Sequence, residues 1–161
     1  MVDVVIMKMI NYFRGDIKRI NHALKVYGFA GCIAGGENLS DKEIKVINLA
    51  AVLHDIGIVN AQKKHNSTSG RYQEIEGPGV ARQLMSDISI DVDILERVCF
   101  IIGHHHSYNK IDGDDFQIIV ESDFLVNIDE ENMSLKSIRA ISDKYFKTAT
   151  GTELIKNIYF S

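Results

Sequence analysis

The residues best suited to chemistry are His54 and Asp55, which stand side by side at the end of an apolar run from Ile47 to Leu53. An imidazole and a carboxylate in such a place are costly to bury without partners. Histidine and aspartate are both ordinary ligands of divalent metals, so a bound cation would relieve that cost. The pair therefore predicts a metal site, and Gly57 supplies the turn that ends the preceding helix.

Two further residues could complete this site, His22 before the pair and Asp123 after it. His22 shares a helix face with Val26 and Phe29, where a single histidine is more often a satisfied core or surface residue. Asp123 lies within an apolar helix face, where an aspartate is either paired or binds a cation. We predict that the four side chains surround one metal. Because ligand atoms lie ~2.0–2.6 Å from their ion, the Asp123 carboxylate must then lie within ~8 Å of the His54 imidazole.

Three consecutive histidines, His104, His105 and His106, follow an apolar helical pattern over residues 91–103. Three successive side chains on a helix fan through ~200°, so these three cannot all face one metal. One or two of them are therefore candidates for additional ligands.

The elements that must position these residues are predicted to be helices. Pro78 is the single proline in 161 residues, and so few helix breakers favour an all-α fold. Ser40 and Glu43 form a capping box at the start of the helix that carries His54. Residues 57–72 are polar and predict a loop, followed by a helix with Pro78 in its first turn. Helices are predicted over residues 2–13, 16–34, 40–55, 78–86, 91–103, 116–129 and 134–149, with a short helix after a break at 150–152.

The bulk composition bounds the class of protein. The length fits one compact helical domain over residues 1–161, with a motif-bearing core at about 15–130 and C-terminal helices at 134–161 packed on it. A net charge of −4 without a dense Lys/Arg block argues against binding a nucleic-acid polymer. No apolar run approaches ~18 residues, so we predict no membrane span and a cytoplasmic location. Cys32 and Cys99 are expected to be reduced, buried thiols, and a homodimer is left open.

The order of these residues on successive helices resembles the HD superfamily of metal-dependent phosphohydrolases. That family has a histidine, then the His-Asp doublet, then further histidines and a distant aspartate. The resemblance covers about residues 15–130 and implies a compact helical bundle of the HD-domain type. It also implies that the core metal ligands are His22, His54, Asp55 and Asp123.

Some family members bind a second metal through paired histidines, which His104 and His105 match. Those members also have a histidine between the doublet and the pair, whereas the corresponding residues 73–77 contain Glu74 and Glu76 and no histidine. Either glutamate could replace it as an oxygen ligand or a base. The metal is a divalent ion, with Mn, Fe, Ni, Co, Mg and Zn all compatible, and its number is one or two.

The implied activity is hydrolysis of a phosphate ester, of a nucleotide or another small phosphorylated metabolite. Asp55 can ligate one metal, bridge two or orient the attacking water, and Glu76 or a histidine of 104–106 could be the general acid. Lys18 and Arg71 are the candidates for holding substrate phosphate, although solvated charge also explains both.

Two other functions stay open. One is a non-catalytic metal- or nucleotide-binding sensor module with the same fold, favoured by the missing histidine and by the lack of an acidic residue after the doublet at 57–59. The other is a phosphodiesterase or pyrophosphohydrolase that acts on a signalling nucleotide.

Overall fold

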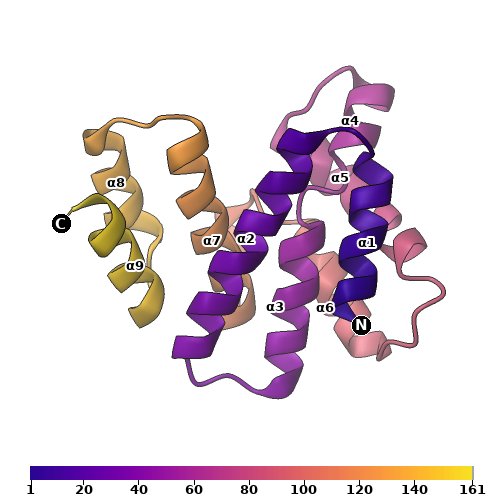
Figure 1. The fold of residues 1–161 in the computed structure, drawn as a ribbon, viewed down its shortest axis with the longest axis horizontal. Helices are drawn as coiled ribbons and strands as arrows, with labels where there is room; N and C mark the ends of the chain where they lie inside the picture. The colour runs from indigo at the N-terminus through magenta and orange to yellow at the C-terminus, as the bar shows by residue number, and fades with distance from the viewer. Residues whose placement is uncertain (161) are drawn as a thin grey trace.

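The computed structural model describes residues 1–160, and all regular structure in that range is helical (Figure 1). The all-α prediction is therefore confirmed. The α-helices are α1 (Val2–Phe13), α2 (Ile17–Gly36), α3 (Asp41–Leu53), α4 (Ile58–His65), α5 (Gly70–Leu84), α6 (Val92–Ile102), α7 (Asp114–Glu130), α8 (Leu135–Tyr145) and α9 (Ala149–Tyr159), with a short 3₁₀ helix at Tyr108–Lys110.

Helix starts follow the capping residues in the sequence. The Asp16 side chain accepts a hydrogen bond from the Arg19 backbone at the start of α2. Ser40 and Glu43 form the expected capping box at the start of α3. These caps satisfy backbone N–H groups that have no partner within the helix. These caps therefore set the first residue of each helix, and with it the positions of His22 in α2 and His54 after α3.

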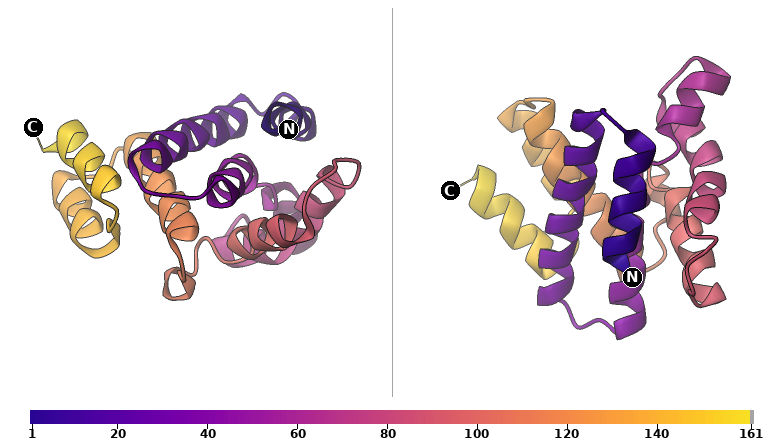
Figure 2. Two further views of the ribbon diagram at one scale, coloured as in Figure 1. Left: turned by 90° about the horizontal axis from the view of Figure 1, so that it is seen from below. Right: turned by 45° about the vertical axis from the view of Figure 1, so that its right-hand side comes forward.

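Helix α3 is the centre of the bundle. It packs against α1, α2, α6 and α7, and Figure 2 shows it between α2 and α6 in the view from below. In its C-terminal half, from Ile47 to Leu53, every residue except Asn48 is completely or almost completely buried. Burial of aliphatic side chains in this way is the main stabilising term of a helical core. The His54-Asp55 pair therefore follows directly on the buried end of the central helix.

The predicted loop at residues 57–72 is wrong, because α4 and the first turn of α5 occupy most of it. Pro78 accordingly lies inside α5 and not in its first turn. Packing of α4 on α5 overrides the polar composition here. A methyl group at Gly57 would overlap the backbone oxygen of Gln73 and lie 2.6 Å from the backbone nitrogen of Gly77. Glycine at position 57 thus lets α5 approach the turn that follows the doublet.

The predicted break at residues 150–152 is also misplaced. Helix α8 ends at Tyr145, and 150–152 form the first turn of α9, which Thr148 caps by accepting from the Gly151 backbone. In Figure 1, α8 and α9 form a pair at one end of the molecule beside α7.

Two further expectations concern the cysteines and membrane spans. Cys99 is buried as expected, but Cys32 is exposed on α2, and both are free thiols. No single helix within residues 1–160 is long and apolar enough to cross a membrane; α3 and α4 together meet that length and composition, with a bend of 43° between them.

Glu121 anchors the C-terminal helices to the rest of the bundle. Its side chain is completely buried and accepts hydrogen bonds from the Lys147 backbone at 2.7 Å, the Thr148 backbone at 2.9 Å and the Thr148 hydroxyl at 2.5 Å. A fourth donor is the Gln117 amide, at 2.7 Å. The segment between α8 and α9 therefore depends on one carboxylate from α7.

We expect Glu121→Ala to lower the free energy of unfolding by about 3 kcal/mol, because it leaves several buried donors without an acceptor. Urea denaturation followed by circular dichroism measures this. Glu153→Ala on exposed α9 surface is the matched control and should change it by less than ~0.5 kcal/mol. Equal effects of the two substitutions would show that the buried carboxylate is not an anchor.

Candidate metal centre

Side chains from three regions of the chain converge beside the C-terminal end of α3. His22 comes from the second turn of α2, His54 and Asp55 from the turn that follows α3, and Asp123 from α7. His54 is completely buried, and His22 and Asp123 are each only 8% exposed. The four residues predicted to surround one ion are therefore brought together in a largely buried place.

The ligand atoms of this group lie at short distances from one another. His22 Nε2 is 3.2 Å from both His54 Nε2 and Asp123 Oδ1, and His54 Nε2 is 3.6 Å from Asp123 Oδ1. Asp55 Oδ2 is 3.6 Å from both of these imidazole nitrogens. The requirement that Asp123 lie within ~8 Å of His54 is met.

Each of the two imidazoles also makes a hydrogen bond through Nδ1, the ring nitrogen turned away from the cluster, and this bond fixes the orientation of the ring. His22 Nδ1 donates to Glu130 Oε2 at 2.9 Å, and His54 Nδ1 donates to the Ala51 carbonyl at 2.8 Å. Each acceptor is an oxygen without a proton, so the hydrogen must be on Nδ1. In a neutral ring Nε2 then carries a lone pair and points into the cluster, as a metal ligand does.

This arrangement leaves an electrostatic conflict that a cation resolves. Two Nε2 lone pairs, on His22 and His54, face each other at 3.2 Å, with a carboxylate oxygen of Asp123 equally close. None of these three atoms is a donor to the other two, and acceptors that face one another repel in a buried place. A divalent metal accepts all three atoms, so the residues fit the ion that the sequence predicts.

The pKa values show that the cluster attracts positive charge. Burial by itself lowers the pKa of His54, but the charge of Asp55 and the hydrogen bond to Asp123 outweigh burial and raise it to about 9. Burial favours the neutral acids, yet neighbouring histidines hold the pKa of both aspartates well below the ordinary value. The carboxylates are thus ionised and available to a cation.

A second group of potential ligands shares Asp55. Asp55 Oδ1 lies 3.3 Å from His105 Nε2, and His106 offers a further nitrogen within the same group. Among the described residues, His106 Nε2 and Gln73 Oε1 are the buried side-chain atoms without a hydrogen-bond partner. Burial, reinforced by His105, lowers the pKa of His106 to about 4, so its ring is neutral. This group could hold a second metal.

His104 lies outside both groups. Its Nδ1 donates to the Phe100 carbonyl at 2.7 Å, and its ring packs on the Phe100 ring with centroids 4.4 Å apart. The sequence singled out His104 and His105, whereas the structure brings His105 and His106 to Asp55. Three successive side chains point in different directions, and the turn after α6 selects the second and third.

The two glutamates of α5 differ in their surroundings. Glu76 binds Lys64 at 2.6 Å and His65 at 2.9 Å, on α4, and the structure does not bring it to the cluster. Glu74 accepts hydrogen bonds from the His106 backbone at 3.0 Å and from the Ser107 hydroxyl at 3.1 Å. Glu74 thus holds the segment that carries His106.

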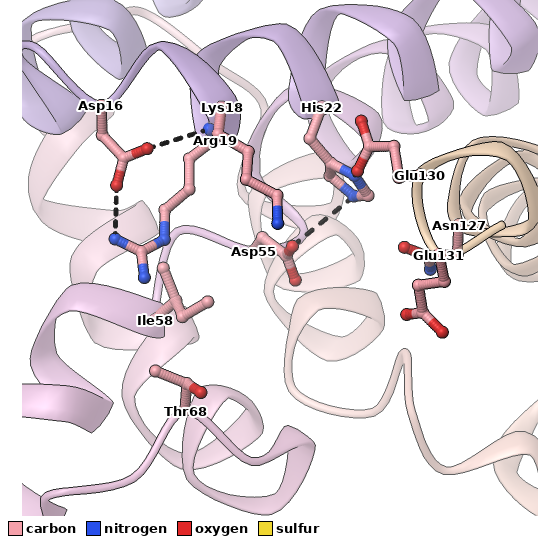
Figure 3. Close-up of a pocket in the computed structure, with 10 residues that line it drawn as sticks. All are labelled: Asp16, Lys18, Arg19, His22, Asp55, Ile58, Thr68, Asn127, Glu130 and Glu131. Carbon is pink, nitrogen blue, oxygen red and sulfur yellow. Dashed lines mark hydrogen bonds and ion pairs between the residues drawn. The ribbon is translucent and has the colours of Figure 1, made fainter.

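A pocket of about 350 Å³ opens beside Asp55 and His22 (Figure 3). Lys18 and Arg19 line one side, and Arg19 is paired with Asp16 at 2.6 Å. The other side is lined by residues of α7 and its end: Asn127, Glu130 and Glu131. Lys18 therefore lines the same pocket as His22 and Asp55, and its role in holding substrate phosphate stays a prediction.

The second predicted substrate ligand, Arg71, does not line this pocket; its guanidinium lies 5.9 Å from the Tyr72 ring centroid.

Sequence reasoning missed two residues of α7 that support the cluster. Asn127 donates from Nδ2 to Asp123 Oδ1 at 2.9 Å, and Glu130 binds His22. They follow Asp123 by four and seven residues, a spacing that places all three on one helix face. That periodicity was the available signal for both.

The comparison with known families agrees with this geometry. The family model of the HD domain matches residues 19–144, a span that includes all four converging residues. The chain belongs to the HD domain family, so the resemblance seen in the sequence is confirmed together with the fold class. The family is generally one of metal-dependent hydrolases. No curated protein and no solved structure shows a significant match to the chain.

We expect Mn²⁺ to raise the melting temperature of the metal-free protein by about 5–10 °C at 100 times its dissociation constant, since that excess contributes about 2.7 kcal/mol. His54→Ala should abolish this rise, and His106→Ala should reduce it. The matched control, His104→Ala, should retain the full rise. A rise lost in His104→Ala and kept in His106→Ala would contradict the placement of the histidines.

Proposed function

We propose that the protein is a metal-dependent phosphohydrolase that acts on a phosphate ester, either a nucleotide or another small phosphorylated metabolite. The observation that carries the proposal is the convergence of His22, His54, Asp55 and Asp123. Two of the four, His22 and Asp55, line an open pocket that also contains Lys18. Buried ligands beside a pocket with a cationic side chain suit an anionic substrate.

His22, His54 and Asp123, with Asp55, would hold the metal. When bound, a divalent metal lowers the pKa of water and neutralises charge that develops during phosphoryl transfer. Asp55 directs one oxygen to His22 and His54 and the other to His105. This division supports Asp55 as a ligand shared between two metal positions, and His105 and His106 as ligands of the second.

Lys18 is the residue best placed to bind the phosphate. It lies four residues before His22 on the same helix, which brings it one turn from the cluster. Among the described residues it has no ion-pair partner, whereas Arg19 is engaged by Asp16. An ammonium group free of partners can bind and orient a phosphate oxygen without first breaking an ion pair.

Glu76 is not supported as the general acid, because it is already paired with Lys64 and His65. His106 is neutral near pH 7 and cannot donate as an imidazolium. The chain therefore offers Asp55 and Lys18 for orienting water and phosphate, and the leaving group takes its proton from solvent or from another histidine. The proposed setting remains cytoplasmic, and self-association as a homodimer remains a prediction.

A sensor module that binds metal without catalysis is the second candidate. It is favoured by Gln73, a buried amide with an unpartnered oxygen in the stretch where binuclear family members have a histidine. A phosphodiesterase or pyrophosphohydrolase of a signalling nucleotide is the third.

The decisive experiment is a hydrolysis assay over a panel of nucleotides and sugar phosphates with Mn²⁺, Co²⁺, Mg²⁺, Ni²⁺ and Fe²⁺. We expect phosphate release from at least one phosphomonoester and a loss of more than ~100-fold in both His54→Ala and Asp123→Ala, because even changes around metal ligands cost 10–100-fold. Circular dichroism establishes that the variants fold. Metal bound by the wild type with no substrate hydrolysed would favour the sensor.

Lys18→Ala should raise KM for the active substrate by about 10-fold, the equivalent of one charge-assisted hydrogen bond. Arg71→Ala, which removes a cation outside the pocket, should leave KM within about twofold. Steady-state kinetics on the two variants tests this, and the reverse pattern would place the phosphate elsewhere.

A further inference from the structure

Three imidazoles of the metal centre donate Nδ1–H to an acceptor, but the acceptors are of two kinds. His54 donates to the Ala51 carbonyl and His105 to the Ile102 carbonyl, in each case three residues earlier. Both histidines follow the end of a helix, where the last carbonyls have no intrahelical donor. Helix ends thus supply these acceptors without help from another element.

The His22 Nδ1–H cannot take a backbone carbonyl of its own helix as acceptor. His22 lies in the second turn of α2, where backbone carbonyls already accept from the N–H four residues later. Its acceptor comes instead from another helix, as the carboxylate of Glu130, 2.9 Å from Nδ1. The second Glu130 oxygen accepts from Lys25 Nζ at 3.2 Å.

Local stability does not explain an acid at this position. Glu130 is the last residue of α7, and a negative charge at a helix C-terminus is unfavourable. Its pair with Lys25 contributes little, because the lysine side chain is 48% exposed. The Glu130 side chain is itself only 16% exposed and turned toward His22 (Figure 3). The contact that compensates for its position is therefore the one with His22.

We propose that Glu130 is a positioning residue that holds His22 with Nε2 toward the metal, and that it sets the affinity of the site for its ion. This inference rests on the proposed metal centre. A carboxylate partner fixes the tautomer and orientation of a ligating imidazole and makes the ring a stronger ligand. Of the three imidazoles whose Nδ1 donates, His22 is the one whose acceptor is a replaceable side chain.

The test is isothermal titration calorimetry, in which Mn²⁺ alone is added to the metal-free protein. We expect Glu130→Ala to weaken binding 10- to 100-fold, the usual effect of removing such a partner. Glu130→Gln removes the charge but keeps an oxygen acceptor, so its affinity should lie between those of Glu130→Ala and the wild type. Lys25→Ala should stay within about threefold of the wild type.

Glu131→Gln is the matched control. Glu131 is the next residue, lines the same pocket and carries the same charge, but the carboxylate that His22 Nδ1 contacts is that of Glu130. We expect its affinity to remain within about twofold of the wild type. An equal loss in Glu131→Gln and Glu130→Ala would show that only negative charge matters and would overturn the positioning role.

A second measurement does not depend on affinity. In the zinc-loaded wild type, the His22 Nδ1–H proton should give a downfield, slowly exchanging resonance, as expected of a proton held by a carboxylate. Glu130→Ala should lose it while the corresponding proton of His54 is retained.

If the wild type binds Mn²⁺ and Glu130→Ala keeps both the wild-type affinity and the His22 resonance, the positioning role of Glu130 alone is overturned. Failure of the wild type to bind Mn²⁺ at all would overturn the metal centre as well.

Discussion

Two imidazole nitrogens that face each other at 3.2 Å, with a carboxylate oxygen equally near, are the constraint on which the structure depends. The Nδ1 atoms of His22 and His54 are both committed to acceptors, so neither ring can turn a neutral N–H toward the other. Repulsion among the inward atoms is relieved only by positive charge. A proton can provide it, as the pKa of His54 raised by Asp55 and Asp123 shows, and a divalent metal provides it more completely.

The helices are arranged so that this group stays in place. Helix α3 is surrounded by α1, α2, α6 and α7, and its buried apolar side chains fix the position at which His54 leaves it. Gly57 lets α5 approach the following turn closely, and Glu74 of α5 holds the backbone of His106. Helix α7 supplies Asp123, Asn127, which donates to Asp123, and Glu130, which accepts from His22. One face of α7 therefore provides one ligand and supports two.

The sequence predicted those parts of the site that depend on helical periodicity. His22 and Asp123 could be assigned to inward faces because their neighbours at helical spacing are apolar. The choice among the three histidines could not be predicted, because the turn after α6 sets their directions and periodicity ends there. The helical structure of residues 58–65 was missed because its sequence is polar and its stability comes from packing on α5. Periodicity places Glu130 on the same face of α7 as Asp123, but its contact with His22, 108 residues away, depends on how α2 and α7 pack.

The most direct measurement of the central claim is the anomalous scattering of a crystal grown with Mn²⁺. We predict a peak about 2.0–2.6 Å from His22 Nε2, His54 Nε2 and an Asp123 oxygen, with Asp55 alongside. A well-ordered crystal that shows Mn²⁺ elsewhere, or shows the four side chains paired among themselves at saturating metal, would contradict the account.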